Sequence, residues 1–473
     1  MSQIVAPVSA HPAVTGPRSV AVLVVLLAGQ FMAVLDASIV NVAAPAIRTD
    51  LRAGGAALQV IVAGYVIAYA VLLVAGARLG ERYTQRRAFV VGLAVFTLAS
   101  LACGSAWNEV SLIVFRFVQG AGAAVMVPQV MTLIQRTFTG TARARALGLY
   151  AMIVSGGVVA GQILGGLIVD ADLAGSGWRG VFLVNVPLGL GLWVLAVRVL
   201  PMTEGRTDRR VDWAGLVTFT ASVLLLVVPL MVGYELGFPT WTVLCLGAGV
   251  LAAGAFWVVE RTVARQGRDP LFAPRVVGAA GLIPSAATLL LIMAVFSGWL
   301  FAWALYLQGE LGYSAVRAGT QFLPMGLAFA VAGLYWQRIP HRWQARMIPA
   351  ALVLDAVALA WLAGLSHAGA GTGLAVSVAF ALFGLGNGLA FSPLMTRALS
   401  AVPVALAADA SGILVTVVQL GIVAGIAGFG SVFLAAAETM AAAEAVRLVQ
   451  LGGAAASLVA AATAVVAVRR TRR

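Results

Sequence analysis

Two charged side chains lie deep inside stretches that are otherwise apolar, and they are the first candidates for chemistry in this chain. Asp36 follows Leu35 in one such stretch, and Arg116 stands in another. A carboxylate in hydrocarbon costs several kcal/mol, so by default it marks an ion or proton pathway. A guanidinium keeps its proton in proteins, so Arg116 needs a counter-charge or converging carbonyl and hydroxyl groups.

Asp36 is the candidate partner of Arg116. An ion pair between them would favour the ionised carboxylate, and protonation of Asp36 would loosen the pair, which would make a switch. Two structural alternatives stay open. Asp36 could serve as hydrogen-bonding glue between helices, and Arg116 could only tie down a helix.

The composition places both residues in a membrane protein. Of 473 residues, 62% are hydrophobic and 10% are charged, against roughly 45–50% and 25% in soluble domains. Stretches long enough to cross a hydrocarbon core of ~30 Å recur throughout the chain. Fourteen spans are predicted, at 20–46, 56–76, 88–106, 110–133, 146–169, 181–200, 213–232, 241–259, 277–307, 318–335, 347–365, 373–395, 411–437 and 451–468.

The net charge of +13 could suggest nucleic acid, but its distribution argues against that. With a cytoplasmic N-terminus, 24 of the 30 basic residues fall in inner segments, 5 fall in outer loops, and Arg116 lies within a span. This positive-inside bias predicts that both termini are cytoplasmic. Basic residues that are all arginine, together with abundant Ala, Gly and Val, hint at a GC-rich bacterial genome, so the bacterial cytoplasmic membrane is the expected location.

The chain contains no lysine. A phosphate-binding loop of the G-x-x-x-x-G-K-[ST] type is therefore impossible, and so is a retinal Schiff base. No His, Cys and Glu cluster has metal-ligand spacing within a span. We therefore expect no cofactor, no metal and no enzyme activity, and transport becomes the main hypothesis. A nontransporting sensor or scaffold should carry a sizeable soluble domain, and no loop is long enough for one.

Five segments are expected along the chain. They are an N-terminal cytoplasmic tail (1–19), a six-helix bundle (20–200), a linker with a central helix pair (201–276), a second six-helix bundle (277–468) and a basic cytoplasmic tail (469–473). Paired bundles with the substrate site at their interface are the usual construction of secondary transporters.

Several motifs resemble those of one family. The first span carries Leu35-Asp36, Ser38, Asn41-Val42-Ala43 and Pro45, and the fourth carries Arg116-x-x-Gln119-Gly120-Ala121-Gly122. The fifth span has Gly148, Gly157, Gly161 and Gly165-Gly166, and the sixth opens with Trp178-Arg179-x-x-Phe182-x-x-Asn185-x-Pro187-x-Gly189. Over nearly its whole length the chain resembles the fourteen-helix drug:proton antiporters of the major facilitator superfamily.

The resemblance implies an all-α integral membrane fold, with two six-helix halves and a central pair. For Asp36 it implies proton exchange and contact with a cationic substrate, with Arg116 as its modulator. We expect a substrate cavity lined by Ser38, Asn41, Gln119, Phe296, Trp299, Trp303 and Asn387. Phe296, Trp299 and Trp303 share one face of the ninth span, and an interfacial aromatic belt is the alternative interpretation of that face.

Gating is expected in two places. In the family, the glycines of the fifth span, here Gly157, Gly161 and Gly165, seal the cavity. Gln162 stands where the family has proline, so this span should be straighter. After the second span, Glu81, Arg82 and Arg86 keep the charge pattern of the family's loop motif and predict a cytoplasmic gate. Positive charge that only sets the topology explains the same pattern.

Two further features are expected to be structural. The motif that opens the sixth span combines an interfacial Trp178, a headgroup-level Arg179 and a proline near the helix start. Asp355, buried in the eleventh span, should be held by a partner that the sequence does not identify.

The sequence thus predicts export of a hydrophobic or amphiphilic, drug-like compound in exchange for protons. The protein should be embedded in the lipid bilayer, and a monomer is the simplest expectation. The rival within transport is an importer or facilitator of a small metabolite. Such a protein should line its cavity with several polar groups, and few are available deep in the spans.

Overall fold

The structure is a computed structural model that describes residues 17–201, 212–279, 281–367, 372–400, 402 and 406–470. Most of the expected N-terminal tail, nearly all of the polar linker and the last three residues lie outside the described residues. Fourteen helices in the described part are long and apolar enough to cross a membrane. This confirms the all-α fold with fourteen membrane helices.

The N-terminal bundle contains α1 (Pro17–Leu51), α2 (Gly55–Arg82), α3 (Gln85–Gly104), α4 (Glu109–Thr137) and α5 (Gly140–Ala171), and its sixth span is divided into α6 (Gly180–Leu183) and α7 (Asn185–Val199). Local sequence sets the start of α4. The Asn108 side chain accepts from the Ser111 amide and the Ser111 hydroxyl accepts from the Asn108 amide, which forms a capping box.

The central pair consists of α8 (Trp213–Glu235) and α9 (Thr240–Arg265), followed by the short α10 (Pro274–Val277). The two long helices pack against each other, and α8 also contacts α2 and α16. The pair therefore touches both bundles along one seam.

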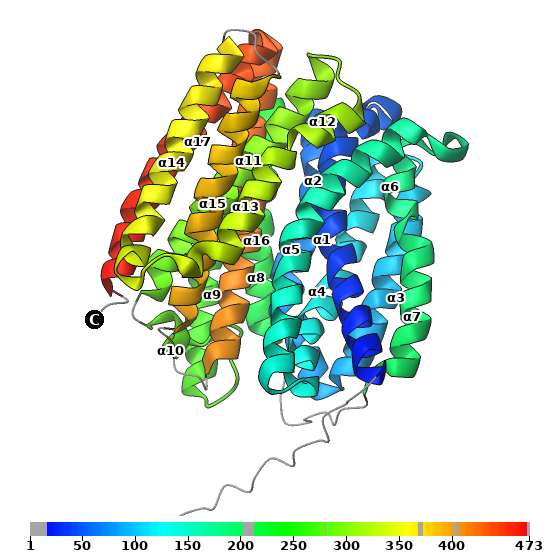
Figure 1. Ribbon diagram of the computed structural model, residues 1–473, viewed down its shortest axis with the longest axis vertical. Helices are drawn as coiled ribbons and strands as arrows, with labels where there is room; N and C mark the ends of the chain where they lie inside the picture. The colour runs from blue at the N-terminus through cyan, green and yellow to red at the C-terminus, as the bar shows by residue number, and fades with distance from the viewer. Residues whose placement is uncertain are drawn as a thin grey trace, which may run out of the picture.

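The C-terminal bundle contains α11 (Leu282–Gly309), α12 (Ala315–Gln321) with α13 (Leu323–Tyr335), α14 (His341–His367), α15 (Leu374–Ser400), α16 (Ala407–Thr439) and α17 (Ala442–Arg470). Figure 1 shows the two bundles side by side, with α1 beginning and α17 ending toward the same, lower end. We call this the terminal end, and the other the opposite end.

Three hydrogen-bonded contacts join the bundles toward the opposite end. Gln308 on α11 donates to the Val42 carbonyl on α1, and Gln59 on α2 bonds to Ser431 on α16. The Asp170 carboxylate of α5 accepts from the first amides of α12, at 3.0 and 3.1 Å. In Figure 1 the ends of α5 and α12 lie together at the top. The bundles are therefore closed against each other at the opposite end.

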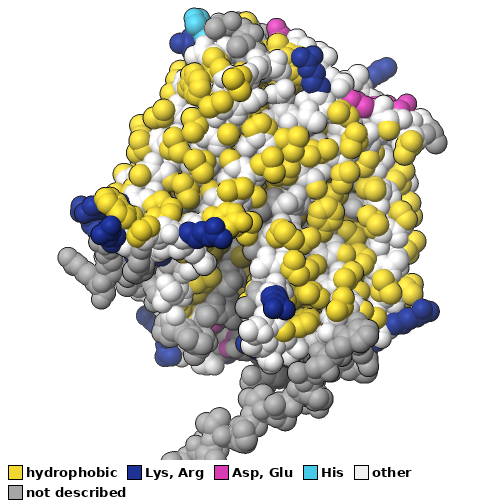
Figure 2. All heavy atoms as spheres, in the orientation of Figure 1, with side chains coloured by type: hydrophobic (Ala, Val, Ile, Leu, Met, Phe, Trp, Pro, Cys, Tyr) yellow, Lys and Arg dark blue, Asp and Glu magenta, His cyan; other side chains and the backbone are white. Residues whose placement is uncertain are grey.

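Side-chain chemistry on the surface agrees with a membrane location. In Figure 2 apolar side chains cover the middle of the visible face, and most arginines lie toward its two ends. An apolar belt between charged ends is what a bilayer requires of a multi-span protein.

Candidate functional site

The candidate site lies inside the N-terminal bundle, where Asp36 on α1 faces α4. Both Asp36 and Arg116 are fully buried. The Arg116 Nη1 donates to Asp36 Oδ2, and the two side chains form an ion pair. The pairing expected from the sequence is therefore present in the structure.

The other carboxylate oxygen of Asp36 accepts two amide hydrogen bonds. Gln119 Nε2 donates to Oδ1 at 2.7 Å, and Asn185 Nδ2 donates to it at 2.9 Å. Gln119 also donates to the Ser100 hydroxyl on α3 at 2.7 Å. Three donors on α4 and α7 thus converge on one carboxylate, which is the arrangement that stabilises a buried charge.

The guanidinium of Arg116 is held from several sides. Its Nε donates to the Ile61 carbonyl of α2 at 3.2 Å, and its Nη1 donates to Gln119 Oε1 at 2.7 Å. Its carbon lies 4.7 Å from the ring centre of Tyr65 and 5.5 Å from that of Phe182, within cation–π range. Nη2 has no hydrogen-bond partner among the described residues. One ion pair therefore connects α1, α2, α4 and the sixth span.

This environment corrects one expectation. Asn185, interpreted from the sequence as part of a purely structural motif, is a direct donor to Asp36. The position of Asn185 in the chain gave no signal of this, because its partner is 149 residues away. Asp36 itself has no exposed surface, and Arg116, Gln119 and Asn185 donate to its carboxylate.

The glycines of α5 pack directly against α1. A Cβ on Gly161 would collide with the Ser38 Oγ, one on Gly157 would lie 3.0 Å from Val34, and one on Gly165 would lie 2.9 Å from Ile39. The absence of side chains at these glycines lets α5 approach α1 closely.

Ser38 and Asn41 belong to the same contact. The Ser38 hydroxyl bonds to the Leu35 carbonyl at 3.1 Å, and the Asn41 amide donates to the Ser38 carbonyl at 3.2 Å. Gln162 Nε2 donates to the same carbonyl at 3.1 Å. The residue that replaces the family's proline therefore ties α5 to α1, two residues beyond Asp36.

The comparisons with known proteins agree with this architecture. The POT family transporter PepTSo superposes with a TM-score of 0.69 at 14% identity, over 97% of this chain and 99% of that one. A bacterial homologue of the human lysosomal transporter Spinster, inward-facing and unoccupied, gives 0.68 at 16%, over 97% and 98%. The Major Facilitator Superfamily model matches residues 26–426. The chain belongs to the major facilitator superfamily.

Two relatives are named for a compound that they transport or export. A probable actinorhodin transporter of Streptomyces coelicolor is 35% identical over 419 residues, which cover 88% of this chain and 72% of that protein. A cephamycin export protein of Amycolatopsis lactamdurans is 38% identical over 408 residues, which cover 84% and 82%. This superfamily member is thus a multi-pass membrane transporter.

In this member of the superfamily, the aromatic face of α11 points into the C-terminal bundle. Trp299 and Trp303 are 1% and 0% exposed, and Trp299 packs edge-on against Phe380 and Phe383 with ring centres 4.9 Å apart. Phe296 continues the cluster toward Phe383 at 6.3 Å. The alternative of an interfacial aromatic belt is wrong for the two tryptophans, because they are buried. The indole N–H of each has no partner among the described residues.

Asp355 on α14 lies beside Gly386 and Asn387 on α15. The Asn387 amide donates to the Phe383 carbonyl at 3.0 Å. Asp355 packs where Gly386 has no side chain, and its Oδ1 has no partner in the described part of the chain. Asn387 is thus engaged inside the C-terminal bundle.

The expected gate residues lie at the terminal ends of α2 and α3. Arg86 donates to the Val197 carbonyl of α7, and the Arg82 guanidinium lies 5.5 Å from the ring centre of Tyr83. Both contacts stay within the N-terminal bundle. Glu81 is partly exposed beside them.

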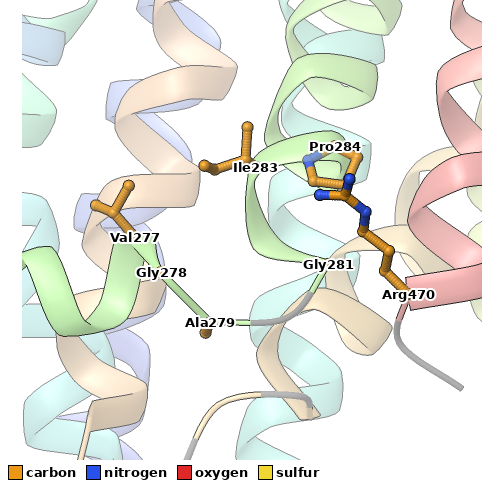
Figure 3. Close-up of a pocket in the computed structure, with 7 residues that line it drawn as sticks. All are labelled: Val277, Gly278, Ala279, Gly281, Ile283, Pro284 and Arg470. Carbon is orange, nitrogen blue, oxygen red and sulfur yellow. The ribbon is translucent and has the colours of Figure 1, made fainter. Parts of the chain in front are cut away.

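A separate pocket of about 320 Å³ lies at the terminal end, between the turn that precedes α11 and the end of α17. Gly281, Pro284 and Arg470 are among its lining residues, and Figure 3 shows the Arg470 side chain reaching toward Pro284. None of the residues of the Asp36 network lines this pocket.

Proposed function

We propose that this transporter is a proton-coupled antiporter that exports a hydrophobic or amphiphilic compound across the bacterial cytoplasmic membrane, with both termini in the cytoplasm. The observation that carries the proposal is the enclosed pair of Asp36 and Arg116. When a buried carboxylate with a single guanidinium partner binds a proton, its ion pair with the guanidinium is lost, and release of the proton restores the pair. The export functions named for the relatives support a drug-like substrate.

Protonation of Asp36 removes the negative charge that neutralises Arg116. The ionised carboxylate satisfies Arg116 and accepts from Gln119 and Asn185. The protonated form carries no charge, so the fully buried Arg116 loses its counter-charge. An unpaired buried charge is costly, and the protonated protein therefore favours an arrangement in which α1 and α4 move apart or water reaches the guanidinium.

The packing provides a route from this site to the opposite end. Asp36 and Ser38 share α1, Gln162 binds the Ser38 carbonyl from α5, and Asp170 further along α5 holds the start of α12. A Cβ on Gly166 would lie 2.5 Å from the Ala315 carbonyl, so α5 and α12 pack at close range. Movement of α1 on protonation would be passed through α5 to the contact between the bundles.

The polar residues favour export of an apolar compound over import of a polar metabolite. Gln119 and Asn387, two of the few amides deep in the spans, already donate to Asp36 and to the Phe383 carbonyl. The C-terminal bundle offers aromatic rings instead. The ring centre of Phe329 lies 6.2 Å from that of Phe296 and 6.3 Å from that of Phe391. Flat apolar compounds are the ligands that such a surface binds.

Proton entry supplies the energy. A membrane potential provides ~2.3 kcal/mol per charge per 100 mV, and the chain has no lysine with which to build a phosphate-binding loop. We further propose that Glu81, Arg82 and Arg86 take part in closing the terminal end when the bundles rock, since they lie at the ends of α2 and α3.

The test is dye and drug accumulation in an efflux-deficient bacterial host that expresses the chain. Accumulation of at least one lipophilic compound should fall, and a protonophore should abolish the effect. Efflux that survives collapse of the proton gradient but stops on ATP depletion would contradict proton coupling. A host that expresses the chain with Asp36→Asn serves as the matched control.

A further inference from the structure

A second group of buried carboxylates lies at the terminal end of the central pair, away from Asp36. Asp212 caps the start of α8 and is 6% exposed, and Glu260 near the end of α9 is 0% exposed. Asp212 Oδ1 accepts from the Gly215 amide at 2.9 Å. The proposed exchange of a proton at Asp36 does not use either residue.

The two carboxyl groups face each other across Gly215. A Cβ built on Gly215 would overlap Glu260 Oε1 and lie 2.7 Å from Asp212 Oδ2. Both oxygens therefore border the same small space beside Gly215. Asp212 Oδ2 is buried and has no hydrogen-bond partner among the described residues, so an oxygen without a donor borders the space that Glu260 also borders.

Glu260 also holds the loop that connects the central pair to the C-terminal bundle. Its Oε1 accepts from the Leu271 amide at 3.2 Å, and its Oε2 accepts from the Phe272 amide. On the other side of this loop, Arg78 at the end of α2 donates to the carbonyls of Asp269 and Pro270. The loop is thus fastened to Glu260 by its amides and to α2 by its carbonyls.

Among the described residues, Arg78 from α2 is the cation that acts on Glu260, and Asp212 is a second negative charge beside it. Two buried carboxylates at short range repel each other and cannot both ionise cheaply. A single proton between Asp212 Oδ2 and Glu260 Oε1 removes the repulsion and supplies the missing donor.

We propose that Asp212 and Glu260 form a second proton-binding site, which holds one shared proton and keeps the loop of residues 269–272 docked between α9 and α2. The ligand is the proton itself: it binds one carboxylate oxygen and is hydrogen-bonded by the other. Loss of this proton leaves two adjacent negative charges, which separate and loosen the loop. The site reports the pH at the terminal end and does not depend on what the protein exports.

Hydrogen exchange on the purified full-length transporter tests the proposal. The readout is the protection of the Leu271 and Phe272 amides as a function of pH, after correction for intrinsic exchange rates. In the wild type, protection should fall at least tenfold as the pH rises through the titration of Glu260. Asp212→Asn should abolish this pH dependence, because the new amide replaces the proton as donor to Glu260 and still caps Gly215.

Glu260→Gln is the second variant, and it should also give protection that does not change with pH. Glu310→Gln, an exposed carboxyl group at the opposite end, is the control and should behave like the wild type. Infrared difference spectra provide an independent measurement: a carboxylic acid C=O band that titrates in the wild type should be missing in Asp212→Asn and Glu260→Gln and present in Asp36→Asn. A band that disappears only in Asp36→Asn, or loop protection that titrates equally in all variants, would overturn the proposal.

Discussion

Replacing Asp36 with asparagine gives the sharpest test of how the buried ion pair works. The amide keeps the shape of the carboxyl group and can still accept from Gln119 and Asn185 through one oxygen. Its NH₂ group then faces Arg116, which is also a donor, so the guanidinium loses its charge partner. Because Arg116 is fully buried, the change mimics the protonated carboxyl group permanently.

The magnitude follows from the burial of the pair. Removing one partner of a buried ion pair costs about 3–5 kcal/mol, and 1.36 kcal/mol corresponds to a tenfold change in an equilibrium constant. The variant should therefore shift the balance between conformations by roughly two to four orders of magnitude and lower the thermal stability of the closed form. Proton-coupled export should be lost entirely, since no group at position 36 can carry a proton.

The assay is drug-driven proton movement in proteoliposomes, with melting of the purified protein as the measure of stability. Asp355→Asn is the matched control, because Asp355 is another buried carboxyl group and lies beside the amide of Asn387. Combining Asp36→Asn with Arg116→Met should restore much of the stability lost in the single variant, because both charges are then absent, but it should not restore export. Full coupling in Asp36→Asn, or strictly additive losses in the double variant, would refute the reasoning.

Three further predictions concern the surroundings of this site. Asn185→Leu removes the amide that donates to Asp36 at 2.9 Å. It should destabilise the ionised carboxylate by about 1.5–3 kcal/mol and move the pH profile of export to higher pH. An unchanged pH profile would contradict a role for Asn185 in stabilising the ionised Asp36. Gly161→Val should overpack the contact between α1 and α5 at a cost of about 1–3 kcal/mol and reduce export. Gly156→Val is the control and should melt like the wild type, because a Cβ at that position would meet no neighbour. Equal melting temperatures of the two variants would argue against tight packing at Gly161. Gln162→Leu should insert into the membrane but lose about 1 kcal/mol with its bond to α1. Gln162→Pro should lose more, because proline also removes a backbone hydrogen bond within α5. A wild-type melting temperature in Gln162→Leu would show that the bond contributes nothing.

The membrane helices and the ion pair of Asp36 and Arg116 could be predicted because each has a strong local or chemical signal. Long apolar stretches define spans by length alone. Asp36 and Arg116 are opposite charges that hydrocarbon does not tolerate singly, so their pairing follows from cost.

The remaining contacts depend on which face each helix turns toward its neighbours, and apolar spans in lipid carry little periodicity that shows this. Asn185 donates to Asp36 across 149 residues, and Asn387 lies beside Asp355. Gln162 looked like the loss of a proline, yet it makes a bond to α1. An amide that could serve several partners does not identify one until the helices are assembled.

The position of the central pair has a consequence for how a compound reaches the transporter. Because α8 contacts both α2 and α16, this seam between the bundles is bridged, whereas the seam formed by α5 with α12 and α13 has no such bridge in the described part of the chain. Once the hydrogen bonds of Asp170 to α12 break, no further described helix holds the bundles together at the second seam. A lipophilic molecule would then arrive sideways from the bilayer, so its partitioning into lipid, more than its concentration in water, would set how fast it is captured.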